Sequence, residues 1–282
     1  MRRRLLAGAT AVLASGLVVA ALAVPSDAAP GGIKGPKPKP TSTPTATATA
    51  TPTPTVEPTP TATATGGATC TDGFTIPEGS AASYFEADGS EYLIHNNNWN
   101  DDAGGTSTIT ACNYDSWSLV SDTPDHSDMS VQTYPNVHRD YNDVALENIR
   151  SARFAATGPR CTGCVYNIAF DLWLDSNFSH ELMIWTDNWG QRPLGSIVAT
   201  VVIGGHEYQV WRYGSGDGGV MTYLSTTPQT SGTLPLSDFF ADVRSRGWNV
   251  ETTWQVDYGV EIVDTNGDPE RFNFTDFYID DF

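Results

Sequence analysis

The chain has no lysine after Lys39 and is poor in bases from there on. Of the 15 basic residues, six precede residue 69 and nine follow it, whereas only Asp27 and Glu57 of the 33 acidic residues precede it, which leaves 31. Residues 69–282 therefore carry a net charge near −22. Nucleic acids and other anionic polymers are bound through Lys and Arg, so this balance excludes them as partners. A neutral polymer meets no such conflict.

Several motifs of cofactor and metal chemistry are also missing. The five histidines are scattered singly, and the chain has no Gly-x-Ser-x-Gly elbow, phosphate-binding loop or glycine-rich dinucleotide turn. Asp264, Asn266 and Asp268 alternate as in a calcium loop, but Gly267 is out of place and the closing Glu is absent. We interpret this stretch first as a turn, with calcium as the alternative, and expect no cofactor and no metal.

The N-terminal quarter lacks any pattern that could form a folded core. Residues 1–29 have a basic start, an apolar run and a small-residue end, which predicts a secretory signal cleaved after Ala28 or Ala29. An uncleaved anchor is the alternative, and no later segment could cross a membrane. Residues 30–68 are a Pro/Thr-rich repeat, which indicates a disordered, extended linker. Residues 69–282 contain no second linker, so we expect one domain there.

Within that domain, short runs rich in Val, Ile, Tyr, Trp and Phe alternate with Gly, Asn, Asp and Pro clusters. This pattern predicts an all-β sandwich or barrel. The expected strand segments are 91–99, 107–114, 116–120, 127–134, 147–156, 165–174, 180–185, 195–205, 206–213, 220–227, 249–263 and 271–282. A helix is expected within 233–248, with Ser237 as its N-cap and Gly247 at its end.

Four cysteines in a secreted domain indicate two disulfides. Three pairings are possible, and the spacing favours Cys70 with Cys112 and Cys161 with Cys164. The Cys-x-x-Cys sequence could also indicate redox chemistry or zinc, but it lacks a βαβ context and a second ligand pair. We therefore expect both disulfides to be structural.

The most informative stretch is Asn167–Trp185, NIAFDLWLDSNFSHELMIW. Strand alternation places Ile168, Phe170, Leu172 and Leu174 on one face and the acidic Asp171 and Asp175 on the other, with Trp173. In the next strand Glu181, Met183 and Trp185 share the face opposite Leu182 and Ile184. A carboxylate beside aromatic rings suits a sugar, because pyranose C–H faces pack on rings. Acidic residues on a wetted sheet face are also ordinary, so the pattern alone leaves both readings open.

The sequence FDLWLD…ELMIW resembles the nucleophile hairpin of glycoside hydrolase family 12. The resemblance implies a β-jelly-roll sandwich of the concanavalin-like type, with one short helix packed on the outside, and a retaining endo-β-1,4-glucanase. It implies that Glu181 is the nucleophile and that Asp171 orients it. In a plain hairpin with loop 176–180, however, Asp175 would face Glu181 and Asp171 would face Trp185. Asp175 therefore stays open as the alternative.

A second motif lies near the C-terminus, in QVDYGVEIVD. Gly259-Val260-Glu261 resembles the family's Gly-x-Glu sequence, which implies that Glu261 is the general acid/base. Relatives often have an aromatic residue or Pro soon after this Glu, whereas Ile262 and Val263 follow here. Alternation places Gln255, Asp257, Gly259 and Glu261 on one strand face. A retaining enzyme holds its two carboxyls about 5–5.5 Å apart.

Further segments resemble the walls of the family's substrate cleft. HNNNWN resembles its NNxW segment, which implies that Asn97 and Trp99 contact substrate, with a core position of Trp99 as the less favoured alternative. Met183 and Trp185 match cleft residues beside the nucleophile, with Trp185 as the sugar platform. TYPNV and PLGSIV match segments that we expect to be structural and to border the cleft, respectively.

These observations predict a secreted, extracellular, monomeric endo-β-1,4-glucanase acting on cellulose or a related β-glucan polysaccharide, with no membrane attachment after signal cleavage. We expect a mildly acidic pH optimum, because one carboxylic acid must remain protonated. Two alternatives remain: a β-glucan-binding jelly-roll module without catalysis, and an endo-xylanase or xyloglucanase of the same clan.

Overall fold

The computed structural model describes residues 69–281, apart from 87–88, 101–103 and 125–128. The described residues belong to one compact unit of the chain. The expected signal, 1–29, and linker, 30–68, lie outside the described residues. No helix in the described part of the chain combines the length and the apolar character that a membrane span requires.

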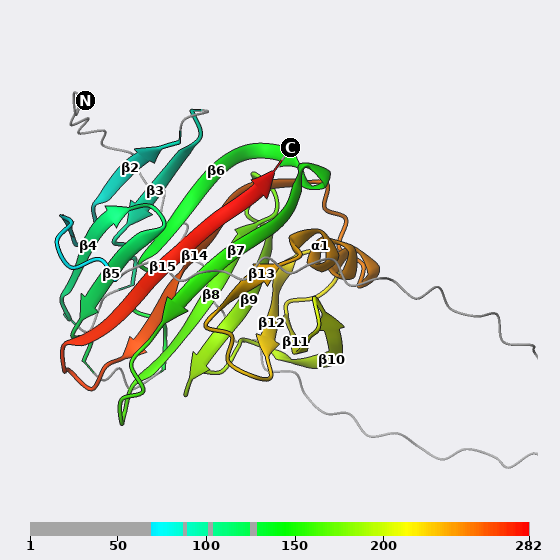
Figure 1. The fold of residues 1–282 in the computed structure, drawn as a ribbon. Coiled ribbons are helices and arrows are strands. Elements are labelled where there is room, and N and C mark those ends of the chain that lie inside the picture. The colour runs from blue at the N-terminus through cyan, green and yellow to red at the C-terminus, as the bar shows by residue number, and fades with distance from the viewer. Residues whose placement is uncertain (1–68, 87–88, 101–103, 125–128, 282) are drawn as a thin grey trace, which may run out of the picture. The chain divides into compact units, whose positions relative to one another are not determined.

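The described residues form two β-sheets stacked face to face (Figure 1), which is the jelly-roll sandwich that the resemblance implied. The six-stranded sheet contains, in spatial order, β1 (Phe74–Pro77), β4 (Ser107–Asn113), β5 (Ser116–Ser121), β15 (Glu270–Asp281), β7 (Ile149–Thr157) and β13 (Ser231–Leu234). The nine-stranded sheet contains β10 (Ser196–Ile203), β11 (His206–Tyr213), β12 (Gly219–Ser225), β9 (His180–Trp189), β8 (Val165–Trp173), β14 (Thr252–Asp264), β6 (Asn136–Ala145), β3 (Glu91–His95) and β2 (Ala81–Phe85). Neighbouring strands pair antiparallel, except that β9 and β12 run parallel.

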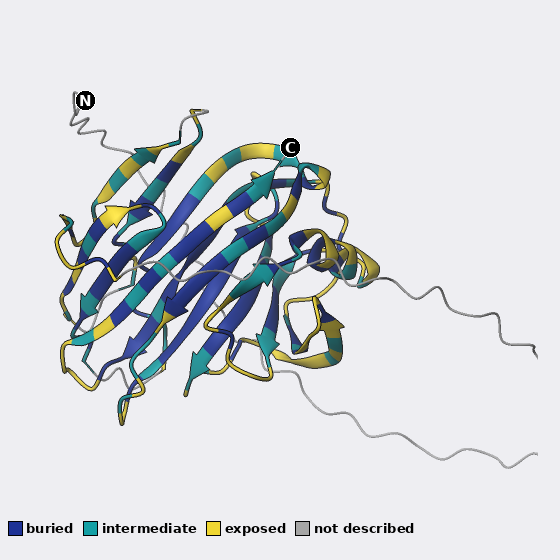
Figure 2. Ribbon diagram, in the orientation of Figure 1, coloured by how far each residue is buried: buried dark blue, intermediate teal, exposed yellow. Residues whose placement is uncertain are grey.

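The hydrophobic core fills the space between the two sheets. Ile168, Phe170 and Leu172 are fully buried in it, as their alternation predicted. Phe170 of the nine-stranded sheet meets Phe154 of the six-stranded sheet edge to face, with ring centroids 5.7 Å apart. The middle strands of both sheets are mostly buried, whereas exposed residues gather at the loops and the outer strands (Figure 2). The apolar alternation along β8 therefore predicted its core face correctly.

The single α-helix of the described residues, α1 (Leu236–Ser245), follows β13, and a 3₁₀ turn, η1 (Leu146–Asn148), joins β6 to β7. The helix buries Leu236, Phe239, Phe240 and Val243, and Phe239 packs edge to face on Tyr208 and Tyr223. The expected N-cap, Ser237, is wrong: the helix begins at Leu236, Pro235 holds the cap position two residues before Ser237, and no side chain caps it. Gly247 follows the C-cap with φ +97°, as expected at a helix end.

Strand prediction failed mainly where the sequence is polar. Residues 129–134 of the expected strand 127–134 form only a bridge at Thr133, which pairs with Ile262. The strand in this region is instead β6, whose sequence NVHRDYNDVA has no apolar alternation. It was missed because pairing with a strand on each side, β14 and β3, imposes its conformation. The short strands β1, β2 and β13 were also not predicted.

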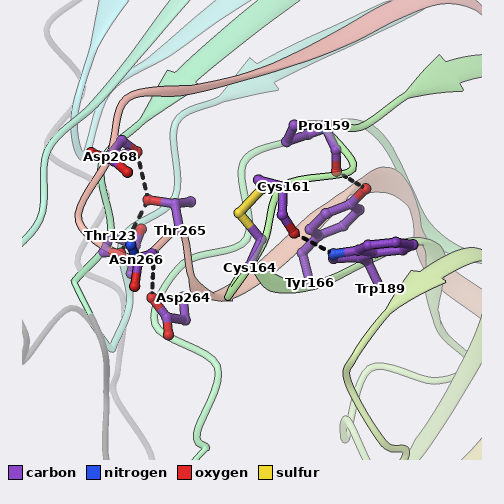
Figure 3. The surroundings of a disulfide bond; sticks show 10 residues. All are labelled: Thr123, Pro159, Cys161, Cys164, Tyr166, Trp189, Asp264, Thr265, Asn266 and Asp268. Atoms are coloured by element: carbon purple, nitrogen blue, oxygen red, sulfur yellow. Dashed lines mark hydrogen bonds between the residues drawn. A yellow bond between two sulfur atoms is a disulfide. The ribbon is translucent and has the colours of Figure 1, made fainter.

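Both predicted disulfides are present, Cys70 with Cys112 and Cys161 with Cys164. Figure 3 shows the second one beside Trp189, whose indole Nε1 donates to the carbonyl of Cys161 at 2.8 Å. The neighbouring Asp264 stretch is a turn between β14 and β15, as interpreted from the sequence. In it the Thr265 hydroxyl donates to the carbonyls of Thr123 and Asp268 (Figure 3).

Candidate active site

The candidate site lies on the face of the nine-stranded sheet that is turned away from the core, here called the site face. Alternate residues of β8, namely Asn167, Ala169, Asp171 and Trp173, define this face because their neighbours along the strand are in the core. On β14 the same alternation brings Gln255, Asp257, Gly259 and Glu261 to the site face, opposite those four β8 residues. The sequence predicted the β14 set and, of the β8 set, Asp171 and Trp173.

The pairing of β8 with β9 differs from that of a plain hairpin. Glu181 lies opposite Trp173, and Asp171 lies opposite Met183. In a plain hairpin Glu181 would lie opposite Asp175, so the observed register is shifted by two residues. The turn is shifted by one residue and not shortened, because Leu174 donates its backbone N–H to the carbonyl of His180 and residues 175–179 form the turn. Asp171 thus lies between the strands that carry Glu181 and Glu261.

Asp175, the alternative neighbour of Glu181, is engaged within the turn instead. Its carboxylate accepts hydrogen bonds from Ser179 and contacts Nδ1 of His180 at 2.7 Å. His180 is buried, contacts Asp217 at 2.7 Å through Nε2, and packs edge to face on Trp248. These contacts hold the pKa of Asp175 below its usual range despite partial burial. The expectation that Asp175 faces Glu181 is therefore wrong.

Glu181 and Glu261 interact electrostatically on the site face. Burial raises the pKa of Glu181 to about 7, and the negative charge of Glu261 adds to that rise. Burial also raises the pKa of Glu261 to about 7, while hydrogen bonds from Asn167 and Gln191 oppose the rise. Two carboxyls that repel each other in this way favour a state with one proton between them.

Asp171 is buried beside both glutamates. Burial raises its pKa well above the ordinary value, and the charges of Glu181, Asp257 and Glu261 raise it further. Its Oδ1 atom accepts no hydrogen bond from a described residue. Asp171 is therefore an acid that carries a proton more readily than an ordinary aspartate, at the centre of a cluster of carboxyls.

On the side away from β8, β14 comes close to the backbone at the start of β6. A Cβ atom on Gly259 would lie 2.3 Å from the carbonyl oxygen of Pro135 and 2.7 Å from Cβ of Asn136. Only glycine allows this approach, which places Glu261 next to the segment that precedes β6. The motif Gly259-Val260-Glu261 thus has a steric reason for its glycine.

Several residues around the carboxyls were not singled out by sequence reasoning. Asn167 lies opposite Glu261 in the β8–β14 pair and donates its amide to Glu261 Oε2. Tyr134 is buried, and its hydroxyl donates to the carbonyl of Ala169 at 3.2 Å. Asp257 and His138 are cross-strand partners on β14 and β6. Alternation gave the face of Asp257, but nothing in the sequence indicated that β6 is its neighbour.

The predicted sugar-contacting residues differ widely in exposure. Trp99 is 64% exposed, whereas Trp185 is 2% exposed and packs with Ala169 and Met183 on the site face. The indole Nε1 of Trp185 has no hydrogen-bond partner among the described residues. Asn97 is half-buried, and its backbone carbonyl accepts from the N–H of Tyr134.

An aromatic cluster not predicted from the sequence lies at one end of β8. Phe178, from the β8–β9 turn, contacts Trp173 and Trp254 edge to face, with ring centroids 5.5 Å and 5.9 Å away. Because Trp173 is opposite Glu181, this cluster borders the carboxyl cluster. It offers apolar ring surface next to a candidate catalytic group.

A separate cavity of about 310 Å³ lies near the end of β9 and includes none of the clustered carboxyls. It is lined by Asp187, Asn188, Gln209, Leu224, Ser225, Thr226 and Pro228. Leu224 is the cross-strand partner of Trp185, so one residue that lines the cavity lies beside Trp185 in the sheet.

Comparison with known proteins identifies the family. Residues 90–280 match the model of glycosyl hydrolase family 12. The chain belongs to glycosyl hydrolase family 12. The family implied by the hairpin and Gly-x-Glu motifs is thus confirmed.

Two curated endoglucanases resemble this chain over part of its length. Endoglucanase S of Pectobacterium parmentieri is 27% identical over 137 residues, which are 43% of this chain and 50% of that protein. Endoglucanase A of Aspergillus kawachii is 25% identical over 124 residues, 39% of this chain and 52% of that protein. The chain therefore spans about half the length of these curated relatives.

Solved structures cover more of the fold. The xyloglucanase domain of NopAA, a type three effector from Sinorhizobium fredii, in complex with cellobiose, is 25% identical, with a TM-score of 0.63. The match covers 74% of this chain and 99% of that one. Endoglucanase 3 of Trichoderma harzianum is 20% identical with a TM-score of 0.64, covering 75% and 98%. The latter similarity supports the family 12 fold.

Proposed function

We propose that this protein is an endo-acting β-1,4-glucan hydrolase that retains the anomeric configuration, with Glu181 as nucleophile and Glu261 as general acid/base. The observation that carries the proposal is the pairing of these two carboxyls on the site face, where burial raises the pKa of Glu181 and the charge of Glu261 raises it further. A retaining hydrolase needs two such groups, one ionised and one protonated.

In the first step the ionised Glu181 attacks the anomeric carbon of the bound glucan. A carboxyl oxygen forms the new bond to that carbon while the glycosidic C–O bond breaks. Glu261 gives its proton to the departing oxygen, which leaves as the hydroxyl of a new sugar end. The amide of Asn167 donates to Oε2 of Glu261 and so orients its carboxyl.

In the second step the ionised Glu261 takes a proton from water, and the water oxygen attacks the anomeric carbon. The ester bond to Glu181 breaks, and both carboxyls return to their starting states. Loss of the charge on Glu181 in the ester removes the repulsion that keeps Glu261 protonated, so Glu261 becomes a base when a base is needed.

The surroundings of the carboxyls suit a neutral polysaccharide. The aromatic cluster of Trp173, Phe178 and Trp254 and the exposed Trp99 offer ring faces on which pyranoses pack. The strongly acidic domain repels anionic polymers. The relatives are named endoglucanases and xyloglucanases, so we propose a β-1,4-linked glucan backbone, as in cellulose, mixed-linkage glucan or xyloglucan.

Two rival functions predict different results. A non-catalytic glucan-binding module needs aromatic rings but has no use for two interacting half-buried carboxyls, whose presence disfavours it. An endo-xylanase would use the same two groups on a different backbone. Neither is favoured by a family whose compared members are named for glucan substrates.

The test is the release of reducing ends from carboxymethylcellulose, barley β-glucan, xyloglucan and xylan by the full mature chain. Wild type should cleave at least one glucan and not xylan, while Glu181→Gln and Glu261→Gln should each lose about 1,000-fold or more. Glu207→Gln, on an exposed acid of β11, is the matched control and should keep wild-type activity. Binding without cleavage would refute the hydrolase, and cleavage of xylan alone would favour the xylanase.

Azide rescue separates the roles of the two glutamates. With an activated aryl cellobioside, Glu181→Ala plus azide should yield the α-glycosyl azide, because azide replaces the missing nucleophile in one displacement. Glu261→Ala plus azide should yield the β-product, because the ester to Glu181 still forms first. The reverse pattern would exchange the two roles.

The proposed enzyme is a secreted, extracellular monomer of three parts: a signal over 1–29, a linker over 30–68 and a catalytic domain over 69–282. Mass spectrometry of protein from the culture medium should find an N-terminus at Ala29 or Pro30. Light scattering should give the mass of one chain. Protein retained on the membrane with residues 1–29 intact would support the anchor instead.

A further inference from the structure

A third aspartate, Asp257, lies beside the proposed catalytic carboxyls. It is the cross-strand partner of Asp171 in the β8–β14 pair, and both side chains are on the site face. Directly opposed residues of antiparallel strands have Cβ atoms about 5 Å apart, so the two carboxyls are neighbours. Asp257 is 4% exposed and Asp171 is 7% exposed.

Within the described part of the chain, these two aspartates have no hydrogen-bond or ion-pair partner that would stabilise an ionised carboxylate. The Oδ1 atoms of both are buried and accept no hydrogen bond from a described residue. The ionisable groups around the pair come from each packed element: His138 and Asp140 on β6, Glu181 on β9, Glu261 on β14 and Tyr134 before β6. None of these is an arginine.

The ionisable neighbours favour protons on the pair. His138 is held neutral, because burial lowers its pKa to about 4. Burial raises the pKa of Asp257 well above its ordinary value, and the charge of Asp140 adds to that rise. Two carboxyls at this separation, without a cation, cannot both ionise at low cost, so they retain a proton between them.

We propose that Asp257 is a positioning residue that acts on Glu181 through Asp171, by keeping a proton on the two facing aspartates. The inference rests on the proposed function, in which Glu181 is the nucleophile. With the proton retained, the Asp171 hydroxyl donates a hydrogen bond to the ionised carboxylate of Glu181 and orients it for attack. If Asp171 were ionised, it would repel Glu181 instead of donating to it.

The proton stays within the cluster throughout the reaction. When Glu181 becomes a glycosyl ester, Asp171 keeps its proton, because the ester carries no charge to attract it. Asp257 therefore takes part in no bond to substrate. Asp257 extends the pH range over which Asp171 keeps its proton and donates a hydrogen bond.

The first test is the pH dependence of kcat/KM for Asp257→Asn on the glucan that wild type cleaves. Asparagine keeps the shape but removes one negative group and one titrating proton, so Asp171 and Glu181 lose their protons at lower pH. The whole profile should move toward acid by roughly half to one pH unit. At the wild-type optimum kcat should fall about threefold to tenfold, with KM unchanged.

The double variant Asp171→Asn/Asp257→Asn tests the route through Asp171. If Asp257 acts only through Asp171, the second substitution should add less than about twofold to the loss caused by Asp171→Asn alone. If the loss in the double variant equals the product of the losses in the two single variants, the route through Asp171 is overturned.

Asp276→Asn is the matched control for structural damage. Asp276 is also a buried aspartate, but it lies on β15 of the other sheet and pairs with Arg153 at 2.6 Å. Its variant should lower the melting temperature without moving the pH profile. An Asp257→Asn variant that behaves in the same way would show a structural role only and would overturn the proposal.

Infrared titration gives a readout that does not depend on hydrolysis. As the pH rises, the absorption of buried protonated carboxyls should disappear at a lower pH in Asp257→Asn than in wild type. An unchanged midpoint of this loss would overturn the pair. If wild type cleaves no glucan, the proposed function fails, whereas the infrared result still decides whether the two aspartates hold the proton.

Discussion

Asn167 and Glu261 lie directly opposite each other in the β8–β14 pair, and the Asn167 amide donates to Oε2 of Glu261. This bond favours the ionised form of Glu261 and so limits the rise in its pKa that burial causes. The same amide nitrogen donates to Gln191, which also bonds to Glu261. The proton affinity of the proposed acid is thus set by two amides from different segments.

Replacing Asn167 with alanine should move the alkaline limb of the kcat/KM profile to higher pH. Loss of the amide raises the pKa of Glu261, and an acid with a raised pKa stays protonated further into the alkaline range. A shift of roughly half to one pH unit is expected. The measurement is kcat/KM against pH on a soluble glucan.

Gln191→Ala serves as the partner variant for Asn167→Ala. It removes the other amide at Glu261 and should shift the same limb in the same direction, by a smaller amount. A shift toward acid in either variant would mean that the amides stabilise the protonated form. The assignment of Glu261 as the acid would then lose its support.

Stability should fall as pH rises through neutrality. Four carboxyls have folded-state pKa values above their ordinary values: Asp171, Glu181, Asp257 and Glu261. Between about pH 4 and 7 the folded state therefore binds more protons than the unfolded state. The stability that these carboxyls contribute is fully present below their unfolded-state pKa values. It is lost as the pH rises through their folded-state pKa values. Glu181→Gln should therefore be more stable than wild type at pH 8, by about 1–3 kcal/mol.

Calorimetry between pH 5 and pH 8 measures this effect. The exposed Glu207→Gln variant should follow the wild-type curve. A gap between Glu181→Gln and wild type that is constant with pH would contradict the linkage, because the gap should widen only as the carboxyls lose protons.

Trp99 and Trp185 should separate binding from stability. Trp99 is 64% exposed, so Trp99→Ala should raise KM about threefold to tenfold with little change in melting temperature. Trp185 is 2% exposed, so Trp185→Ala should cost about 3–5 kcal/mol of unfolding free energy. Kinetics and urea unfolding of both variants measure the difference. A Trp99→Ala variant with unchanged KM would remove Trp99 from the substrate site.

Gly259→Ala should reduce both stability and activity. The added Cβ would meet the Pro135 carbonyl at 2.3 Å, so β14 must move away from the segment before β6. The movement displaces Glu261, two residues along the strand, and we expect at least about a tenfold loss of kcat and about 1–3 kcal/mol of stability. Gly232→Ala, whose Cβ would meet only ring atoms of Phe154 at 3.4 Å or more, is the control. Equal activity in the two variants would refute the steric argument.

Strong local patterns in the sequence predicted much of the fold. The alternation from Ile168 to Leu174 assigned the core face of β8, because a side chain on the wrong face would expose apolar surface. Cysteine spacing predicted both disulfides. The polar strand β6 was missed because its conformation comes from pairing with β14 and β3, and pairing leaves no trace in local composition.

The amino-acid order by itself determined the family, the two sheet faces and the two candidate glutamates, because strand alternation and the Gly-x-Glu motif are local. Only the tertiary structure decided which carboxyls meet. The β8–β9 register separated Asp175 from Glu181, and the β8–β14 register set Asp257 against Asp171 and Asn167 against Glu261. Register depends on turn geometry and on neighbouring strands, so residues far apart in the chain become partners only when the sheet forms.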